Sequence, residues 1–224
     1  MSRAISENEP PNPCEEYGRA KLAAEQVLLA EKEVACAIIR TPTIIQAGRL
    51  GLLAILFEFI DEGRKIWMVG DGSNRYQFIA ARDLTEACLL GLKVDHTELF
   101  NVGSNDVPTL RETYEHVISA AGSRSRVAKF PKWIAIPAMK LAHLLHISPL
   151  GPYHWRMIAE SFRFDISKVE KELGWRPTLG NNEILLEAYL YYKNRRNEIL
   201  SRTNVSAHRK ATPMGAIKIL KWLS

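Results

Sequence analysis

The sequence contains little cysteine and no long apolar run. Its 224 residues include three cysteines, Cys14, Cys36 and Cys88, which lie far apart and form no Cys-x-x-Cys pair. Neither a zinc site nor a disulfide framework is indicated, so we expect a reducing compartment, the cytoplasm. No stretch approaches the roughly 20 apolar residues of a membrane-spanning helix, and the first residues show no apolar core of signal-peptide length. We therefore expect a soluble protein.

Acidic side chains are almost absent from the C-terminal end. Residues 193–224 carry eight Lys/Arg and one acid, Glu198, whereas residues 1–192 carry 22 basic and 24 acidic side chains. The net charge of +5 is thus a property of this basic tail. A nucleic-acid-binding body would need a basic face, so no nucleic-acid partner is expected. The tail is interpreted as a loosely attached extension or, alternatively, as a segment that contacts an anionic membrane surface.

The remaining composition is that of an ordinary globular protein, with 46% hydrophobic and 25% charged residues. Apolar periodicity predicts helices over residues 15–32, 52–62, 83–92, 109–121 and 183–199, and strands over residues 34–39, 65–69, 76–79 and 98–102. Residues 70–72 are interpreted as a hairpin turn, residues 124–129 as a basic loop and residues 133–146 as an apolar helix. This alternation of helices and short strands predicts an α/β fold.

The first chemical candidate is the spacing Tyr17-x-x-x-Lys21. On a helix these two side chains share a face, and a nearby cation favours the phenolate that a tyrosine needs to act as a base. Tyr189 and Lys193 repeat the spacing in a helix that we interpret as a solvated surface element. The spacing alone is therefore not specific.

Other reactive or aromatic side chains predict structural roles. His143 and His146 have no carboxylate or cysteine at ligand spacing, so no metal site is predicted. Aromatic residues of the second half are interpreted as packing residues, namely Trp133, Trp155, Tyr189, Tyr191 and Tyr192.

The context of Tyr17 carries a family resemblance. Residues 13–25, followed by an apolar strand that ends in Arg40-Thr-Pro-Thr43, resemble the catalytic helix and next strand of the extended short-chain dehydrogenase/reductase family, the NAD-dependent epimerases and dehydratases. Three further segments resemble this family in the same order: residues 69–87, residues 100–103 and residues 165–177. Together the matched segments span residues 10–192.

The resemblance implies the C-terminal part of a Rossmann-type parallel sheet plus a small, mostly helical substrate-binding domain. Residues 1–45 would be the remnant of a dinucleotide-binding domain, which strand 98–103 would join. Residues 46–192 would form mainly the substrate-binding domain, and residues 193–224 the basic tail. We expect the chain to lack the glycine-rich half of the dinucleotide-binding domain, because its thirteen glycines never form Gly-x-Gly-x-x-Gly.

The resemblance also implies an oxidoreductase or isomerase chemistry with NAD or NADP. Tyr17 would take the proton of a substrate alcohol during transient hydride transfer, and Lys21 would hold the nicotinamide ribose. Pro42 and Thr43 would contact the cofactor.

The implied substrate is a nucleotide sugar, contacted by Thr43, Arg75 and Arg156. An arginine fork suits the oxygens of a diphosphate. A residue triplet beginning at Ile45 replaces the family's Tyr-Gly-Pro-like turn, which leaves the substrate open. The chain is expected to be incomplete and inactive alone, and a homodimer is possible. The alternatives are a reductase or steroid-type dehydrogenase of the same family and a non-catalytic interaction module.

Overall fold

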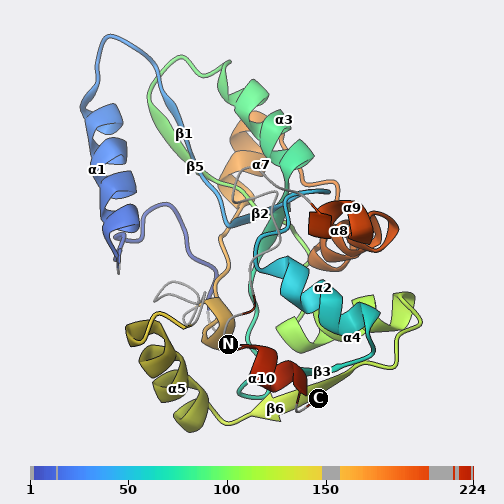
Figure 1. Cartoon of the computed structure of the whole chain (residues 1–224). Coiled ribbons are helices and arrows are strands. Elements are labelled where there is room, and N and C mark those ends of the chain that lie inside the picture. Colours follow the sequence, from blue (N-terminus) through green and yellow to red (C-terminus); the bar gives the residue numbers. More distant parts are fainter. Residues whose placement is uncertain (1–2, 14, 148–156, 202–213, 215–216, 223) are drawn as a thin grey trace. The chain divides into compact units, whose positions relative to one another are not determined.

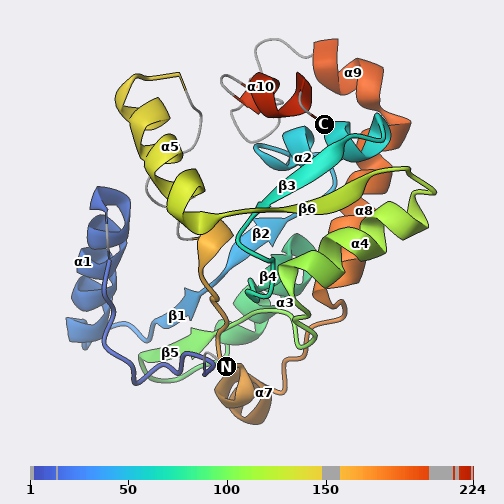
Figure 2. The same ribbon diagram turned by 90° about the horizontal axis from the view of Figure 1, so that it is seen from below.

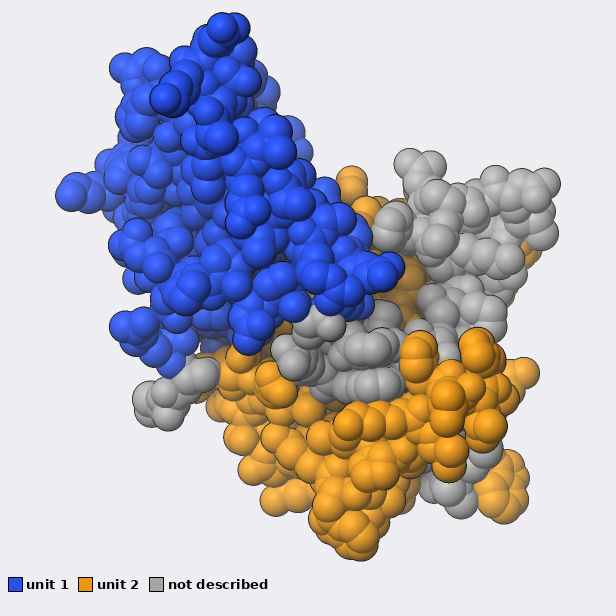
Figure 3. All heavy atoms as spheres, turned by 90° about the vertical axis from the view of Figure 1, so that its left-hand side faces the viewer, with its two compact units in different colours: residues 1–44, 77–107, 162–180 blue, residues 45–76, 108–161, 181–224 orange. Residues whose placement is uncertain are grey.

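The structure, a computed structural model, describes residues 3–13, 15–147, 157–201, 214, 217–222 and 224 (Figure 1). The chain divides into two compact units, each built from three separate stretches of sequence (Figure 3). Unit 1 comprises residues 1–44, 77–107 and 162–180, and unit 2 comprises residues 45–76, 108–161 and 181–224. Among the described residues, no helix is long and apolar enough to cross a membrane.

Unit 1 is centred on two neighbouring parallel strands. β1 (Ala37–Arg40) pairs with β5 (Glu98–Asn101), so that Arg40 lies opposite Asn101 at their carboxyl ends. The other strand pair consists of β4 (Phe78–Ala80) and β2 (Thr43–Ile45), which follows β1 directly. The helices of the unit are α1 (Glu16–Ala30), α3 (Ala81–Gly91) and α7 (Ser167–Leu173). The core consists of residues Ile79, Ala87, Phe100, Val102, Val169 and Trp175.

Two buried polar side chains join the separate stretches of unit 1. Asp83 is 1% exposed, and its carboxylate accepts hydrogen bonds from the backbone N–H (3.1 Å) and hydroxyl (2.6 Å) of Thr178. The indole of Trp175 donates to the main-chain oxygen of Asp83 at 2.9 Å. Gln77 donates to the main-chain oxygen of Ser104 and accepts from the N–H of Phe164. Each buried polar group is therefore satisfied by a segment distant in sequence.

Unit 2 contains a second parallel strand pair with helices around it. β3 (Lys65–Val69) pairs with β6 (Arg126–Phe130), and α2 (Leu53–Asp61), α4 (Leu110–Ala120) and α8 (Asn181–Asn194) pack together beside it (Figure 2). Thr109 and Glu112 form a capping box at the start of α4. The other helices are α5 (Lys132–Leu144), α9 (Arg196–Ser201) and α10 (Ile217–Trp222).

The α/β class is confirmed, with three corrections to the expected elements. Residues 126–130 form β6 rather than a basic loop, because they pair with β3. Residues 70–72 are not a hairpin turn, since β3 and β4 belong to different strand pairs. The helix expected over residues 183–199 is divided into α8 and α9.

The packing role predicted for Tyr189 is confirmed, whereas the solvated helix expected around it and the packing role expected for Trp133 are wrong. Tyr189 is 1% exposed and packs edge-on against Phe57 at 5.7 Å between ring centroids, so its helix is not a solvated surface element. Trp133, interpreted as a packing residue, is 78% exposed.

The basic tail contacts unit 2 through Lys221 of α10, which pairs with Glu58 of α2 (2.6 Å) and with Glu62 at the end of that helix (2.8 Å).

Candidate active site

Helix α1 brings Tyr17 and Lys21 together. The Lys21 ammonium lies 5.7 Å from the centroid of the Tyr17 ring, within the range of a cation–π interaction. Tyr17 is 69% exposed and Lys21 is also exposed. The phenol and the ammonium are therefore both accessible to one bound molecule on the same helix face.

An ion pair ties this helix face to the end of a strand. Glu25 lies one turn beyond Lys21, and its carboxylate receives both the Nε (2.9 Å) and an Nη of Arg40, the last residue of β1. The two side chains are only 20% (Arg40) and 13% (Glu25) exposed. Because Tyr17, Lys21 and Glu25 follow one another at a spacing of four, the pair holds their common face toward the carboxyl end of β1.

The N-terminal stretch extends the same network. An Nη of Arg40 donates to the main-chain oxygen of Glu7 at 3.4 Å, and the Glu7 carboxylate accepts the N–H of Asn101 at 2.8 Å. Both strands of the pair are thus linked at their carboxyl ends. In open parallel sheets, ligands bind beyond this end of the strands.

Pro42 and Thr43 lie directly after the carboxyl end of β1. Pro42 is buried and Thr43 is half-buried. Unit 1 therefore holds four of the predicted site residues: Tyr17 and Lys21 share a face of α1, and Pro42 and Thr43 directly follow β1. Glu25 and Arg40 were not predicted from the sequence as site residues, although the position of Glu25 eight residues after Tyr17 places both on one helix face.

The apolar side chains of α1 do not form the packed face that sequence periodicity suggests. None of the residues of this helix is buried, and Val27, Leu28 and Leu29 are 71%, 41% and 49% exposed. The contact of α1 with the rest of unit 1 thus combines the half-buried Leu22 with the ion pair of Glu25 and Arg40.

Arg75 belongs to unit 2, in the loop that follows β3. The buried side chain of Asn74 holds this loop in place. It is 9% exposed and donates to the main-chain oxygens of Ile158 (3.2 Å) and Glu160 (3.3 Å). The N–H of Arg75 donates to the Ser161 hydroxyl at 3.0 Å, while the residue itself is exposed. The other predicted arginine, Arg156, lies outside the described residues.

The charge of Arg75 acts on a neighbouring helix start. The pKa of Glu112 is lowered chiefly by hydrogen bonds from the N–H and hydroxyl of Thr109, and the positive charge of Arg75 lowers it further. The Arg75 guanidinium therefore lies in the electrostatic environment of the α4 N-terminus.

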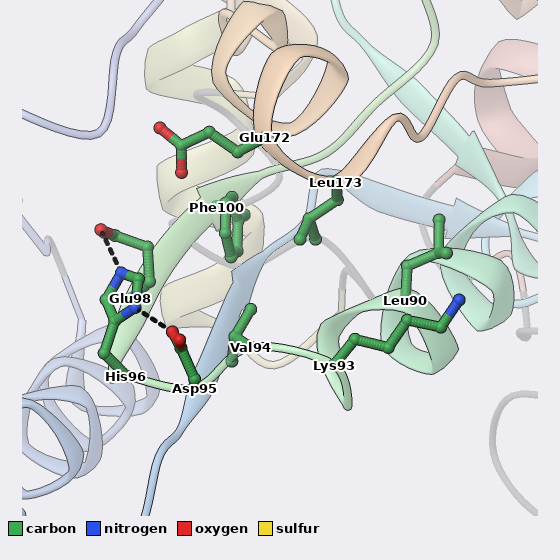
Figure 4. A pocket seen from close by; sticks show the side chains of 9 residues that line it. All are labelled: Leu90, Lys93, Val94, Asp95, His96, Glu98, Phe100, Glu172 and Leu173. Atoms are coloured by element: carbon green, nitrogen blue, oxygen red, sulfur yellow. Dashed lines mark hydrogen bonds and ion pairs between the residues drawn. The ribbon is translucent and has the colours of Figure 1, made fainter.

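A cavity of about 330 Å³ lies at the opposite end of β5 (Figure 4). It is lined by Leu90, Lys93, Val94, Asp95, His96, Glu98, Phe100, Glu172 and Leu173. The hydrogen bond to Asp95 raises the pKa of His96, and the hydrogen bond from Lys168 lowers the pKa of Glu98. Because Glu98 begins β5, this cavity is not part of the region formed by Tyr17, Lys21 and Thr43.

These observations define a class. A parallel strand pair whose carboxyl end is tied to a Tyr-x-x-x-Lys helix is a Rossmann-type α/β arrangement. Residues 2–103, which contain Tyr17, Lys21 and Arg40, match the model of the NAD dependent epimerase/dehydratase family.

Two curated relatives align with most of this chain. The chain is 35% identical over 224 residues to the protein y4nG of Sinorhizobium fredii, covering 99% of this chain and 56% of the relative. It is 24% identical over 199 residues to the UDP-glucose 4-epimerase of Mycolicibacterium smegmatis, covering 85% of this chain and 56% of that protein. The chain thus spans about half the length of these relatives.

Solved structures share the fold. The UDP-glucose 4-epimerase of Thermotoga maritima, solved with UDP-glucose, superposes with a TM-score of 0.67 at 20% identity, covering 88% of this chain and 59% of that one. The UDP-N-acetylglucosamine 4-epimerase of Bacillus cereus gives a TM-score of 0.63 at 19% identity, covering 84% and 59%. At this level of identity the likeness establishes the Rossmann-type fold and no more.

Proposed function

We propose that Tyr17 and Lys21 are the proton-transfer pair of an NAD(P)-dependent epimerase or dehydratase that acts on a nucleotide sugar. The observation that carries the proposal is the Glu25–Arg40 ion pair, which directs the Tyr17 and Lys21 face toward the carboxyl end of β1. This arrangement lies within the part of the chain that matches the family model. The names of relatives and solved structures, which include an epimerase with UDP-glucose and an enzyme with NAD and UDP, support the substrate class.

The exposed pair fits one end of a nicotinamide dinucleotide. A phenol and an ammonium one helical turn apart offer hydrogen bonds to adjacent ribose hydroxyls, and Pro42 and Thr43 lie beyond the neighbouring strand end. When bound, the dinucleotide supplies an acceptor for the substrate hydride. The sequence offers no Gly-x-Gly-x-x-Gly turn for the pyrophosphate, so we propose that turnover requires a further dinucleotide-binding segment.

The chain's own residues would handle the proton and the charge. The Tyr17 hydroxyl oxygen, as phenolate, accepts the proton of the substrate alcohol, and the Lys21 ammonium stabilises that phenolate by charge attraction. Arg75 provides a guanidinium fork for the diphosphate of the substrate, and Asn74 holds its loop in place. Thr43 is proposed as a further substrate contact.

The test is turnover by a fusion in which a glycine-rich dinucleotide-binding segment precedes this chain. UDP-glucose, UDP-N-acetylglucosamine and dTDP-glucose are supplied with a catalytic amount of NAD, and products are separated by chromatography. We expect many product molecules per NAD, because an epimerase or dehydratase regenerates its cofactor. Product limited to one molecule per NAD, with NADH released, would instead establish the dehydrogenase alternative, and the absence of turnover with every substrate in a fusion that binds NAD would contradict the proposal.

Arg75→Ala tests the substrate class in the same fusion. Loss of a charge-assisted contact raises KM by an amount equivalent to roughly 1.5–3 kcal/mol. Arg124→Ala, a change at another exposed arginine of unit 2, serves as the matched control and leaves KM unchanged. Equal KM values for Arg75→Ala and the control would remove the diphosphate role of Arg75.

A further inference from the structure

Helix α5 presents an apolar face to solvent. Its inward side packs through Ala135 and Met139 against Val69 of β3 and the end of β6. On the opposite side, Trp133, Pro137, Leu141 and Leu144 follow one another at spacings of four, four and three, which aligns them along one face.

The exposure of this face is large for its residue types. Trp133 is 78%, Leu141 57% and Leu144 72% exposed, and Leu145 beyond the helix end is 57% exposed. Single exposed leucines are normal on a protein surface, whereas a contiguous apolar stripe along three helical turns marks a contact surface. We call Trp133, Pro137, Leu141 and Leu144 the α5 face.

The sequence around the α5 face is free of acidic side chains. Residues 116–159 contain no Asp or Glu and six Lys/Arg. Among these, Arg124, Arg126 and Lys129 are exposed on or next to β6, and Lys140 is exposed on α5 itself. The register of the strand pair places Arg126 beside Lys65 on the sheet face that also carries Phe130, which packs against α5.

This combination selects among possible partners. A second copy of this chain would bring together two surfaces in which basic side chains are in excess, which charge repulsion opposes. A nucleic acid would satisfy the basic residues and leave the leucines in water. A bilayer with anionic lipids satisfies both, because its interface accepts apolar and tryptophan side chains while its headgroups attract lysine and arginine.

We propose that the α5 face is a docking surface for an anionic membrane surface. The helix would lie in the plane of the interface with Trp133, Leu141 and Leu144 between the headgroups, and with Lys140 of α5 and Arg126 of β6 against the lipid phosphates. The α5 face shares no residue with the region around Tyr17 and Lys21, so this inference stands independently of the proposed function.

The test is flotation of the whole chain with lipid vesicles. We expect binding to phosphatidylcholine vesicles that contain about 30% phosphatidylglycerol, little binding to pure phosphatidylcholine, and weaker binding at high salt. The double variant Leu141→Asp with Leu144→Asp lowers the bound fraction about tenfold. Leu89→Asp with Leu92→Asp is the matched control, since these leucines of unit 1 are 60% and 81% exposed, and it retains binding. Circular dichroism confirms that all variants are folded.

Several results would overturn the proposal. Equal binding to neutral and anionic vesicles, or to neither, contradicts the charge argument. Equal loss in the control variant contradicts the location of the surface. Self-association in light scattering that the Leu141 and Leu144 changes abolish, without vesicle binding, would identify a second copy as the partner.

Discussion

At the scale of single residues, the Glu25–Arg40 ion pair both attaches α1 to β1 and orients Tyr17 and Lys21. Their ion pair is bidentate and four-fifths or more buried, so removal of either charge leaves the other without its partner in a poorly solvated place. The pair also supplies a well-defined contact of α1, a helix without a single buried residue. The orientation of Tyr17 and Lys21 therefore depends on a side chain that performs no chemistry itself.

The first prediction concerns this ion pair. Glu25→Gln keeps the size of the side chain but removes its charge, and should lower the free energy of unfolding by about 1–3 kcal/mol in urea denaturation followed by circular dichroism. Glu16→Gln is the control, because Glu16 and its partner Arg19 are 96% and 58% exposed at 4.0 Å and should change stability by less than about 0.5 kcal/mol. A similar effect of both changes would show that Glu25 does not anchor α1.

Elements of unit 1 are linked by a second ion pair of a different kind. Lys168 of α7 donates to the Glu98 carboxylate and to the main-chain oxygen of Leu99 (3.0 Å), and its ammonium lies 5.2 Å from the centroid of the Phe100 ring. The hydrogen bond from Lys168 lowers the pKa of Glu98 below its ordinary value of 4.5. This contact attaches the short helix α7 to β5.

A pH dependence follows from this lowered pKa. A carboxyl group whose pKa falls on folding stabilises the protein above its ordinary pKa, and this contribution disappears as the pH drops through the lowered value. Lys168→Met should therefore cost about 1 kcal/mol at neutral pH, and the difference from the original protein should shrink below pH 4.5. Urea unfolding of both proteins across about pH 3–7 measures this difference in the free energy of unfolding. Lys171→Met, at an exposed position of the same helix, is the control, and a pH-independent loss for Lys168→Met would refute the assignment.

Elements with strong local signals were predictable from the sequence. The helix at residues 110–120 carries its own capping box, and α7 ends at Gly174, which adopts a left-handed φ of 65°. In contrast, β6 exists because β3, about sixty residues earlier, pairs with it, and no local periodicity reveals such a partner. Trp133 was assigned to packing because large aromatic residues are usually buried, and only its position on the outer side of α5 shows otherwise.

At the scale of the whole molecule, segments far apart in sequence share each unit. Asp83 and Thr178 meet in unit 1, as do Gln77 and Phe164, so the family segments around residues 83 and 178 act as structural partners. The sequence predicted the Tyr17 and Lys21 face but not the contacts that orient it, because those depend on tertiary pairing. The division into residues 1–45, 46–192 and 193–224 stays a prediction, as does the role of Arg156.

The chain by itself should bind NAD(H) in the millimolar range or more weakly. The face with Tyr17 and Lys21 offers contacts to one ribose, whereas the sequence has no glycine-rich helix start for the pyrophosphate. Isothermal titration calorimetry on the purified chain measures this affinity, with UDP as a comparison ligand for unit 2. A micromolar dissociation constant for NAD(H) would show that the chain holds the dinucleotide in another way.

The most direct test of the proposed function is the kinetics of Tyr17→Phe and Lys21→Met in the fusion with a dinucleotide-binding segment. Tyr17→Phe removes the proton acceptor and keeps the ring, so kcat should fall by roughly 10² to 10⁴ with little change in NAD affinity. Lys21→Met should lower NAD affinity and kcat together and move the pH optimum upward, because the phenolate loses its cation. Tyr189→Phe, at the buried tyrosine of the second Tyr-x-x-x-Lys, should leave kcat unchanged. Full turnover by Tyr17→Phe, or equal damage by Tyr189→Phe, would contradict the assignment of Tyr17 as the catalytic base.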